Sequence, residues 1–274
     1  MQALLLDDEP LIRGTAFVVV LLTMAGWEVV AQRRPQRIGR GKRWPSNLLI
    51  VMIDTLAVRV AFPLAAVGTA LLVADQGWGL FNVFAVPVWL AVVVSVLVLD
   101  VAIYFQHRLF HAMPWLWRLH RMHHADLEFD FTTGLRFHPL EIVLSMAIKM
   151  AVVMLLGAPA AAVLLFEVLL NATSMFNHGN VRLSRNLDRR LRWLVVTPDM
   201  HRVHHSIIRR ETDSNFGFNL PWWDKLFGTY RDQPEKGHLG MTIGIEDFRN
   251  AKELRLDRML LQPLRQTPRR GRDD

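Results

Sequence analysis

Long apolar stretches constrain this chain most, because about 20 consecutive apolar residues can cross the hydrocarbon core of a membrane as a helix. Such stretches lie at residues 11–30, 48–73, 80–105 and 140–176. The last is long enough for two short helices, and Gly157, Ala158 and Pro159 interrupt it with residues that favour a tight turn. Since hydrophobic residues make up 51% of the chain, we expect an all-α integral membrane bundle of four to five spans.

The distribution of basic residues predicts the orientation of this bundle, because cytoplasmic loops are enriched in Lys and Arg. The loop at residues 31–46 contains several basic residues and no acidic one, whereas the loop between the second and third stretches offers only Asp75. We therefore place the loop 31–46 in the cytoplasm and the N-terminus outside. Threading the chain forward puts residues 107–138 and everything after residue 178 on the cytoplasmic side. Frequent Ala, Val, Leu and Arg favour a bacterial inner membrane.

Two copies of the pattern His-x-x-His-His are the strongest chemical signal. They comprise His120, His123 and His124, and His201, His204 and His205, and the pair His107 and His111 precedes the first copy. On a helix, positions i, i+3 and i+4 share one face, so each copy can direct its imidazoles to one point. Imidazole binds iron, copper, zinc and nickel, and the chain has no Cys to supply thiolates. Eight histidines suit two ions, whereas a buried structural cluster is the simpler alternative.

Further residues are candidates for the same site. We favour His178, in FNHGN, as a ligand because it emerges on the side of the membrane where the other histidines gather. His138, in RFHP, is a weaker candidate that could instead line a substrate channel or anchor Glu141. Asp100 and Tyr104 lie on the helical face of His107, so they are candidates to orient a ligand or to contact substrate, as are Glu141 and Asp199. A structural ion pair between Asp100 and Arg59 is an alternative.

These patterns together carry a family resemblance. The segments HRLFH, HRMHH, TTGLRFHPLE, NHGN, TPDMHRVHHS and NFGFNLPWWDKLFGTY follow one another between residues 100 and 248. In order and spacing they resemble the fatty acid hydroxylase and sterol desaturase superfamily, whose members are membrane di-iron oxygenases with a cytosolic, histidine-lined centre. Some relatives have one more His a helical turn before His178, where this chain has Ser174, so His138 would have to complete a shell of ten.

The resemblance implies a division of the chain and a ligand set. Residues 1–99 would form an N-terminal transmembrane region, residues 100–248 the catalytic region with a helical hairpin at 140–176, and residues 249–274 a basic tail. The catalytic region would lie partly in a cytosolic helical cap that carries the histidine cluster. The implied iron ligands are His107, His111, His120, His123, His124, His178, His201, His204 and His205, with His138 as a weaker candidate.

The expected function is the hydroxylation or desaturation of a lipid, such as a sterol or a fatty acyl chain, with O2 and two iron ions. No GxGxxG dinucleotide fingerprint is present, so electrons would come from a cytochrome, ferredoxin or reductase. A histidine-rich metal transporter or sensor and a non-catalytic membrane scaffold are the alternatives. The net charge of +7 does not indicate nucleic acid, because the basic residues lie beside apolar runs and no nucleic-acid-binding module is recognisable.

Overall fold

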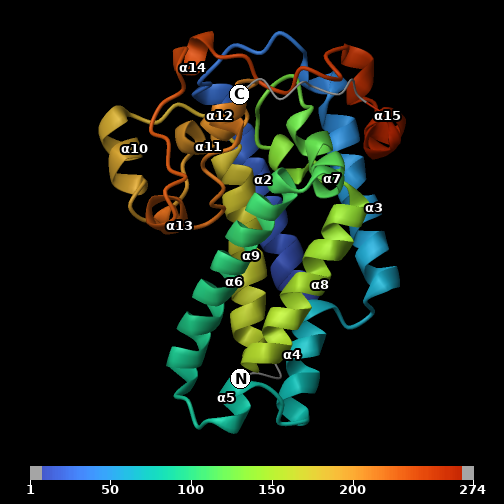
Figure 1. Ribbon diagram of the computed structural model, residues 1–274, viewed down its shortest axis with the longest axis vertical. Coiled ribbons are helices and arrows are strands. Elements are labelled where there is room, and N and C mark those ends of the chain that lie inside the picture. Colours follow the sequence, from blue (N-terminus) through green and yellow to red (C-terminus); the bar gives the residue numbers. More distant parts are fainter. Residues whose placement is uncertain (1–7, 267–274) are drawn as a thin grey trace.

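The computed structural model describes residues 8–266, which form two parts, a bundle of long helices below and a polar end of short helices and loops above (Figure 1). The long elements are α2 (Glu9–Val30), α3 (Trp44–Ala61), α4 (Ala65–Asp75), α6 (Val88–Ala112), α8 (Pro139–Leu156) and α9 (Ala160–Asn177), with the short α5 (Leu80–Val83) at the lower turn. Within residues 8–266 the only β-structure is two isolated bridges. The expected all-α class is confirmed.

Five helical stretches are long and apolar enough to cross a membrane, which agrees with the expected number of spans. They are Glu9–Val30, Arg40–Val83, Val88–Ala112, Pro139–Leu156 and Ala160–Asn177. Many large apolar side chains on these helices are exposed, among them Leu22, Met52, Val60 and Leu155. A bundle in water rarely exposes so much apolar surface, whereas a lipid bilayer covers it.

The second and third spans begin and end differently from the sequence expectation, and proline explains both differences. Residues 48–73 do not form one helix, because α3 ends at Ala61 and α4 begins at Ala65. Phe62, which precedes Pro63, leaves the helical region with φ −137° and ψ 84°, as steric clash with a following proline ring requires. The third span begins at Val88, after Pro87, and continues to Ala112. This extension places both His107 and His111 on α6.

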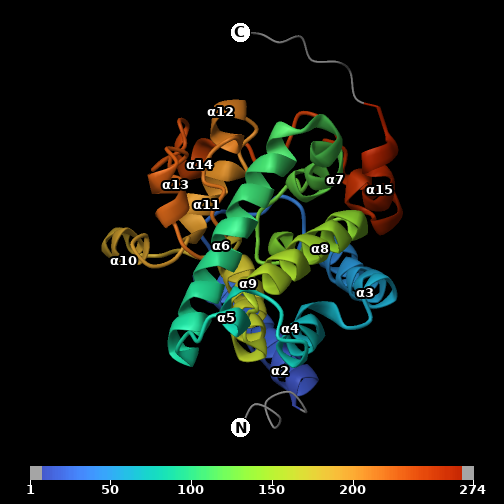
Figure 2. The same cartoon turned by 60° about the horizontal axis from the view of Figure 1, so that its bottom comes forward.

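The hairpin expected at residues 140–176 is present as α8 and α9. Gly157 ends α8 in the left-handed conformation, with φ 67°, and Pro159 precedes α9. A side chain at Gly79 would lie 2.2 Å from the backbone nitrogen of Gly157, so glycine permits the lower loops to approach closely. Both hairpin helices lie between α6 on one side and α2, α3 and α4 on the other (Figure 2).

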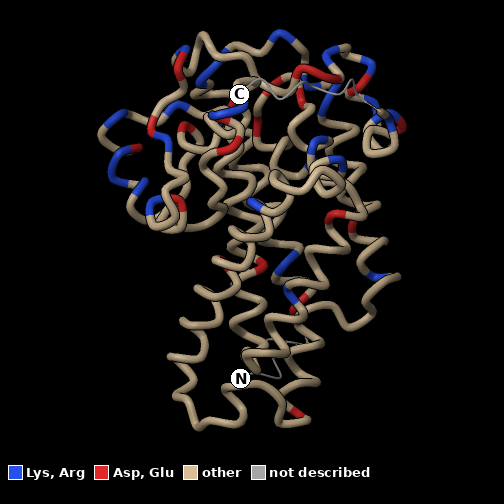
Figure 3. Tube along the Cα trace, in the orientation of Figure 1, with Lys and Arg blue, Asp and Glu red and all other residues tan. Residues whose placement is uncertain are grey.

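The polar end consists of short elements and carries most of the charged residues (Figure 3). Its helices are α7 (Pro114–His124), α10 (Arg185–Leu191), α11 (Pro198–His204), α12 (Arg209–Thr212), α13 (Trp222–Leu226), α14 (Gly237–Gly240) and α15 (Leu256–Leu261). Single 3-10 turns are η1 (Arg40–Lys42), η2 (Thr133–Leu135), η3 (Ala251–Leu254) and η4 (Gln262–Leu264).

Part of the expected basic tail, residues 249–266, packs against the rest of the protein. Within its described portion, η4 packs against α7 and α15 packs against α3. Arg118 donates through Nε to the carbonyl oxygen of Pro263 at 2.6 Å. Residues 249–266 therefore belong to the packed polar end, whereas Arg269, Arg270 and Arg272 lie outside the described residues.

Candidate metal centre

Nine histidines from distant parts of the chain meet where the helix bundle joins the polar end. α6 contributes His107 and His111, and α7 contributes the first triplet. His178 directly follows α9. The second triplet comes from α11 and from His205, the residue after it. They divide into two groups, each with its ligand atoms within 4.8 Å of one another. The first group is His107, His111, His120, His124 and His204, and the second is His123, His178, His201 and His205.

Distances within the groups match those between ligands of one metal ion. The Nε2 atoms of His107 and His120 are 3.1 Å apart, and those of His111 and His124 are also 3.1 Å apart. In the second group, His178 Nε2 lies 3.1 Å from that of His123. Two nitrogens that each lie about 2.1 Å from one ion are separated by about 3 Å when the bond angle is near 90°.

The outer nitrogens of several rings fix which nitrogen carries the proton. Nδ1 of His123 lies 3.2 Å from the carbonyl oxygen of Arg136, and Nδ1 of His178 lies 2.8 Å from that of Ser174. Because a carbonyl oxygen only accepts hydrogen bonds, both Nδ1 atoms must donate. In the neutral rings, both Nε2 atoms then present lone pairs to each other at 3.1 Å. This contact is repulsive unless a cation lies between the two nitrogens.

The first group repeats this arrangement. His107 Nδ1 lies 2.8 Å from the carbonyl oxygen of Phe216, and His204 Nδ1 lies 2.7 Å from that of Ser214. The lone pair on His204 Nε2 is buried and has no hydrogen-bond partner. A buried hydrogen-bond acceptor without a partner costs free energy in a protein interior. The same lone pair, directed at the other imidazoles, is available to bind a metal ion. The donor set therefore fits a pair of transition-metal ions.

Two carboxylates hold further rings of the first group. Glu141 Oε1 accepts from His120 Nδ1 at 2.7 Å, and Asp213 Oδ1 lies 3.3 Å from His111 Nδ1. A carboxylate on the outer nitrogen fixes the orientation of a ligand imidazole and increases its basicity. Glu141, which the sequence suggested as an orienting or substrate-contacting residue, thus contacts an imidazole of the first group, whereas Asp213 was not anticipated.

Burial keeps the imidazoles neutral. Removal from water lowers the pKa of His120 and the pKa of His178 to about 3. The same burial, together with neighbouring imidazoles, holds the pKa values of His123 and His205 well below their ordinary range. A metal ion competes with protons for these nitrogens, so lowered pKa values favour metal binding at neutral pH.

His138 lies outside both groups, so the structure does not favour it as a tenth ligand. Its Nδ1 accepts from the backbone N–H of Leu140 at 3.2 Å and so caps the first turn of α8. Its Nε2 lies 3.3 Å from the carbonyl oxygen of Leu260. Both ring nitrogens are therefore engaged away from the other histidines. Ser174, where some relatives have a further His, donates to the carbonyl oxygen of Gly134.

Asp100, Tyr104 and Asp199 contact neither histidine group directly. Asp100 Oδ2 accepts from Trp223 Nε1 at 2.7 Å, and its expected alternative partner, Arg59, makes no ion pair with it within the described residues. Tyr104 forms a hydrogen bond of 2.8 Å with Thr229 Oγ1. These two side chains thus join α6 to the segment 215–230.

Asp199 joins α11 to the loop that follows α2. Its carboxylate accepts from Arg33 Nε at 3.1 Å and also contacts Arg202. Burial alone would raise the pKa of Asp199, but these cations lower it to about 2. Asp199 therefore fixes the position of the second histidine triplet without touching the imidazoles.

The segment 215–230 contains a supporting residue that the sequence reasoning missed. Asp224 accepts from the backbone N–H groups of Phe216 and Gly217, at 2.8 and 2.9 Å, and from Thr229 Oγ1 at 2.7 Å. These bonds hold the Phe216 backbone whose carbonyl oxygen orients His107. The motif WDKLFGTY was a visible signal for this role, although its partners are backbone atoms that no side-chain pattern identifies.

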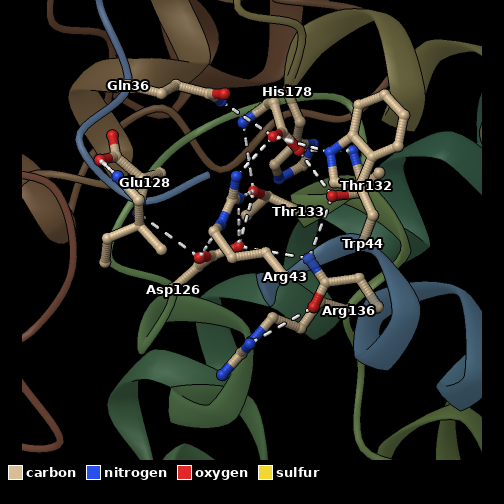
Figure 4. A network of polar contacts seen from close by, with 12 residues as sticks. Gln36, Arg43, Trp44, Asp126, Glu128, Thr132, Thr133, Arg136 and His178 are labelled. Carbon is tan, nitrogen blue, oxygen red and sulfur yellow. Dashed lines mark hydrogen bonds and ion pairs between the residues drawn. The ribbon is translucent and has the colours of Figure 1, made fainter. Parts of the chain in front are cut away.

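A buried ionic network supports the second group (Figure 4). Arg43 donates to both carboxylate oxygens of Asp126, at 2.8 and 2.7 Å, and contacts Asp130. Arg136, next to this network, donates through Nε to the carbonyl oxygen of Met122 at 2.8 Å. Because the carbonyl oxygen of Arg136 accepts from His123, the network holds a ligand orientation from outside the cluster.

A cavity of about 570 Å³ reaches the histidines from the helix bundle. Its walls come from α2, α3, α4, α6, α7, α8, α9 and η2, and they include His107 and His120. Most of the lining is apolar, with Val58, Ile103 and Met146 among the contributors. A long apolar molecule can therefore reach the first histidine group from within the bundle.

Comparison with known proteins identifies the family of the segment that carries the histidines. Residues 92–229, half of the chain, match the model of the fatty acid hydroxylase family. That segment contains all nine clustered histidines. No solved structure matches the chain significantly.

Curated relatives are lipid-modifying enzymes by name. The ornithine lipid hydroxylase OlsE of Rhizobium tropici is 31% identical over 148 residues, which is 54% of this chain and 44% of that protein. The alkylglycerol monooxygenase of Homo sapiens is 28% identical over 185 residues, which is 64% and 39% respectively. The fatty acid hydroxylase vlmA of Lecanicillium is 26% identical over 170 residues, or 57% and 46%. The chain thus spans less than half the length of these relatives.

Proposed function

Since the chain belongs to the fatty acid hydroxylase family, we propose that it is a membrane-bound di-iron oxygenase that hydroxylates a lipid. One observation carries the metal assignment. His123 and His178 both donate through Nδ1 to carbonyl oxygens, so their Nε2 lone pairs face each other at 3.1 Å. A bound cation removes this repulsion. Without it, the cluster would be a buried set of opposed lone pairs.

The proposed reaction inserts one oxygen atom of O2 into a C–H bond. Two electrons and two protons reduce the other oxygen atom to water, so the products are an alcohol and water. Bound iron supplies the activation of O2, which amino-acid side chains cannot provide. The chain's own residues hold the ligand rings in one tautomer, orient them through Glu141 and backbone carbonyls, and exclude bulk water.

Support for a lipid substrate comes from the cavity and from the relatives. The cavity joins the histidines to the apolar interior of the bundle, so a lipid chain need not leave hydrocarbon to be bound. Relatives named ornithine lipid hydroxylase, alkylglycerol monooxygenase and fatty acid hydroxylase favour hydroxylation over the desaturation that the sequence left open.

Electrons would come from a separate protein. Neither a nucleotide-binding fingerprint nor a Cys ligand for an iron–sulfur cluster occurs in the sequence. Exposed Arg185, Arg189 and Arg190 lie on the polar end. This surface suits an acidic cytochrome, ferredoxin or reductase, since complementary charge speeds association. We propose that the protein lies in a bacterial inner membrane and that its polar end faces the cytoplasm.

Oxygen uptake by the purified, iron-loaded protein tests the proposal. With a chemical reductant and total lipid extract of the host, we expect uptake that depends on both additions, and lipid products that are heavier by one oxygen atom. His205→Ala should abolish the uptake, whereas His238→Ala should retain it, because His238 belongs to neither histidine group. Lipid-independent uptake without oxygenated product would contradict a lipid hydroxylase.

A further inference from the structure

Two carboxyl groups in the cavity wall have oxygen atoms that nothing in residues 8–266 satisfies. Asp54 lies on α3 and Glu141 on α8, and both side chains belong to the cavity lining. Asp54 is 7% exposed and Glu141 4% exposed. Asp54 Oδ1 and Glu141 Oε2 are buried without a hydrogen-bond partner. Such acceptors are rare in proteins, because burial without a partner costs the full desolvation free energy.

Most other charged side chains of the cavity are paired with one another. Glu167 accepts from Lys149 at 2.6 Å and from Arg13 at 2.8 Å, and Arg13 also pairs with Glu9 at 2.8 Å. Arg59 is on the same helix as Asp54, but no ion pair joins the two within the described chain. Asp54 and Glu141 therefore offer carboxyl oxygens to this cavity without a Lys or Arg ion-pair partner within the described residues, and Gln106 Oε1 in the same lining is a further buried acceptor without a partner.

One of these carboxyl groups, that of Glu141, lies beside the proposed metal position. The second oxygen of Glu141, Oε1, accepts from His120 Nδ1 at 2.7 Å, so one imidazole ring separates Glu141 from the first histidine group. α3 packs against α8, and the side chains of Asp54 and Glu141 line the same cavity. A ligand bound between these two carboxyl groups is thus held close to the ring of His120.

We propose that Asp54 and Glu141 bind a primary ammonium group of the lipid substrate. Two separate acceptors need at least two donors, and a primary ammonium has three, whereas a hydroxyl has one. Its positive charge also favours the ionised form of both carboxyl groups in apolar surroundings, where charge-assisted hydrogen bonds are strong. The hydrocarbon tail then occupies the apolar part of the cavity.

This inference rests on the proposed function and deepens it. If the ammonium lies between Asp54 and Glu141, the carbons nearest to the metal position are those close to the amine. Oxidation should then occur near the polar end of the substrate and not far along its tail. The reaction remains the hydroxylation given above.

Binding of three matched probes tests the proposal without requiring turnover. Wild-type protein in nanodiscs is titrated with dodecylammonium, dodecanol and dodecyltrimethylammonium, with empty nanodiscs as blanks and native mass spectrometry as the readout. We expect dodecylammonium to bind at least about tenfold more tightly than either of the others, the range that charged hydrogen bonds supply. Equal binding of the trimethylated probe, which has no N–H donor, would overturn the proposal.

Variants then locate the binding. Asp54→Asn should weaken dodecylammonium binding about tenfold and leave dodecanol binding within about threefold. Glu9→Gln makes the same chemical change elsewhere in the cavity and should leave the affinity for dodecylammonium unchanged. If Asp54→Asn and Glu9→Gln weaken binding equally, the assignment to Asp54 fails. If Asp54→Asn does not fold, the relative affinities of the wild-type protein for the three probes alone decide whether an ammonium site exists.

Iron content separates this inference from the proposed function. Protein that lacks iron but prefers dodecylammonium would contradict the di-iron proposal and leave the ammonium site intact. Protein with two iron ions and no preference among the probes would overturn the ammonium site alone.

Discussion

At the scale of single residues, the two nitrogens of four clustered histidines have separate tasks. In His107, His123, His178 and His204 the outer nitrogen donates to a carbonyl oxygen. This bond fixes both the tautomer and the plane of the ring. The inner nitrogen is then available as a ligand before any ion arrives, so little reorganisation accompanies metal binding.

Removal of one imidazole from the second group should lose one of the two ions. His178 contacts His123, His201 and His205 through Nε2, at 3.1 to 3.2 Å. We expect His178→Ala to bind about one ferrous ion per chain in an anaerobic titration. His138→Ala is the matched control, because His138 caps α8 and lies outside both groups, and it should still bind two. The opposite pattern would make His138 the ligand.

The metal-free protein should lose stability in mild acid. Burial lowers the pKa of His120 and the pKa of His178 to about 3, from an ordinary value of 6.5. Below pH 6.5 the unfolded chain binds protons on these rings and the folded chain does not, so the free energy of unfolding falls as the pH decreases from 6.5 towards 3. Thermal unfolding in detergent between pH 7.5 and pH 5 measures this decrease.

The Arg43 network should not contribute to that decrease. Burial acts to raise the pKa of Asp126, but Arg43 lowers it to about 2, from 3.8. Stability from a lowered carboxyl pKa is present above 3.8 and is lost only as the pH falls towards 2. A Tm that stays constant from pH 7.5 to pH 5 would therefore contradict neutral, buried histidines.

The sequence predicts the histidine cluster better than it predicts the groups that orient the histidine rings. Spacing alone placed both triplets on helical faces, because i, i+3 and i+4 positions are neighbours on any helix. The partners of the outer nitrogens are mostly carbonyl oxygens, such as those of Ser174 and Phe216. Every residue has a carbonyl group, so only the folded chain identifies which ones accept. The same limitation applies to His138, whose capping contact depends on where α8 begins.

At the scale of elements, loops and short helices hold the cluster while the long helices provide the cavity. Arg43 precedes α3, yet its guanidinium binds Asp126 and Asp130 in the segment that follows α7. The sequence indicated the basic loop 31–46 as a topology signal only. Its role in a buried network was not predictable, because the partners are more than 80 residues away.

Loss of the Arg43 side chain should destabilise the whole protein. Arg43→Met would leave two buried carboxylates without their cation, which typically costs about 3–5 kcal/mol. Arg185→Met, at an exposed position on α10, should leave the Tm nearly unchanged. Thermal unfolding of both variants in detergent measures the difference, and equal Tm values would show that the network contributes little to stability.

Asp224→Asn should loosen the segment that orients His107. The amide keeps one oxygen but directs an NH2 group at a backbone N–H, an unsatisfied contact that costs about 1–3 kcal/mol. We expect a lower Tm and slower oxygen uptake, with Asp75→Asn on the exposed lower turn as the control. Unchanged uptake would indicate that His107 does not depend on this segment.

At the scale of the whole molecule, charge separates the two ends (Figure 3). Periodicity, hydropathy and proline positions predicted the helical bundle and its hairpin, because each reflects local backbone chemistry. The break between α3 and α4 was missed, since uniform hydropathy across residues 48–73 obscured the effect of Pro63. The packing of the polar end depends on contacts between distant segments, which composition does not encode.

Cysteine labelling tests the proposed orientation, since the chain has no Cys of its own. Gln76→Cys, at the lower turn, and Arg190→Cys, on the polar end, both introduce a thiol at an exposed position. In intact cells, a membrane-impermeant maleimide should label only the first. After cell lysis it should label both. Labelling of the second thiol alone in intact cells would show that the polar end lies outside the cell, the opposite of the proposed orientation.

We propose that nine imidazoles, which meet at the junction of the bundle and the polar end, bind two iron ions. The most direct test is elemental analysis of protein purified from iron-replete cells, with the protein concentration from amino-acid analysis. We predict two iron ions per chain. Folded protein with less than one iron ion per chain, and no other transition metal in its place, would contradict a di-iron centre.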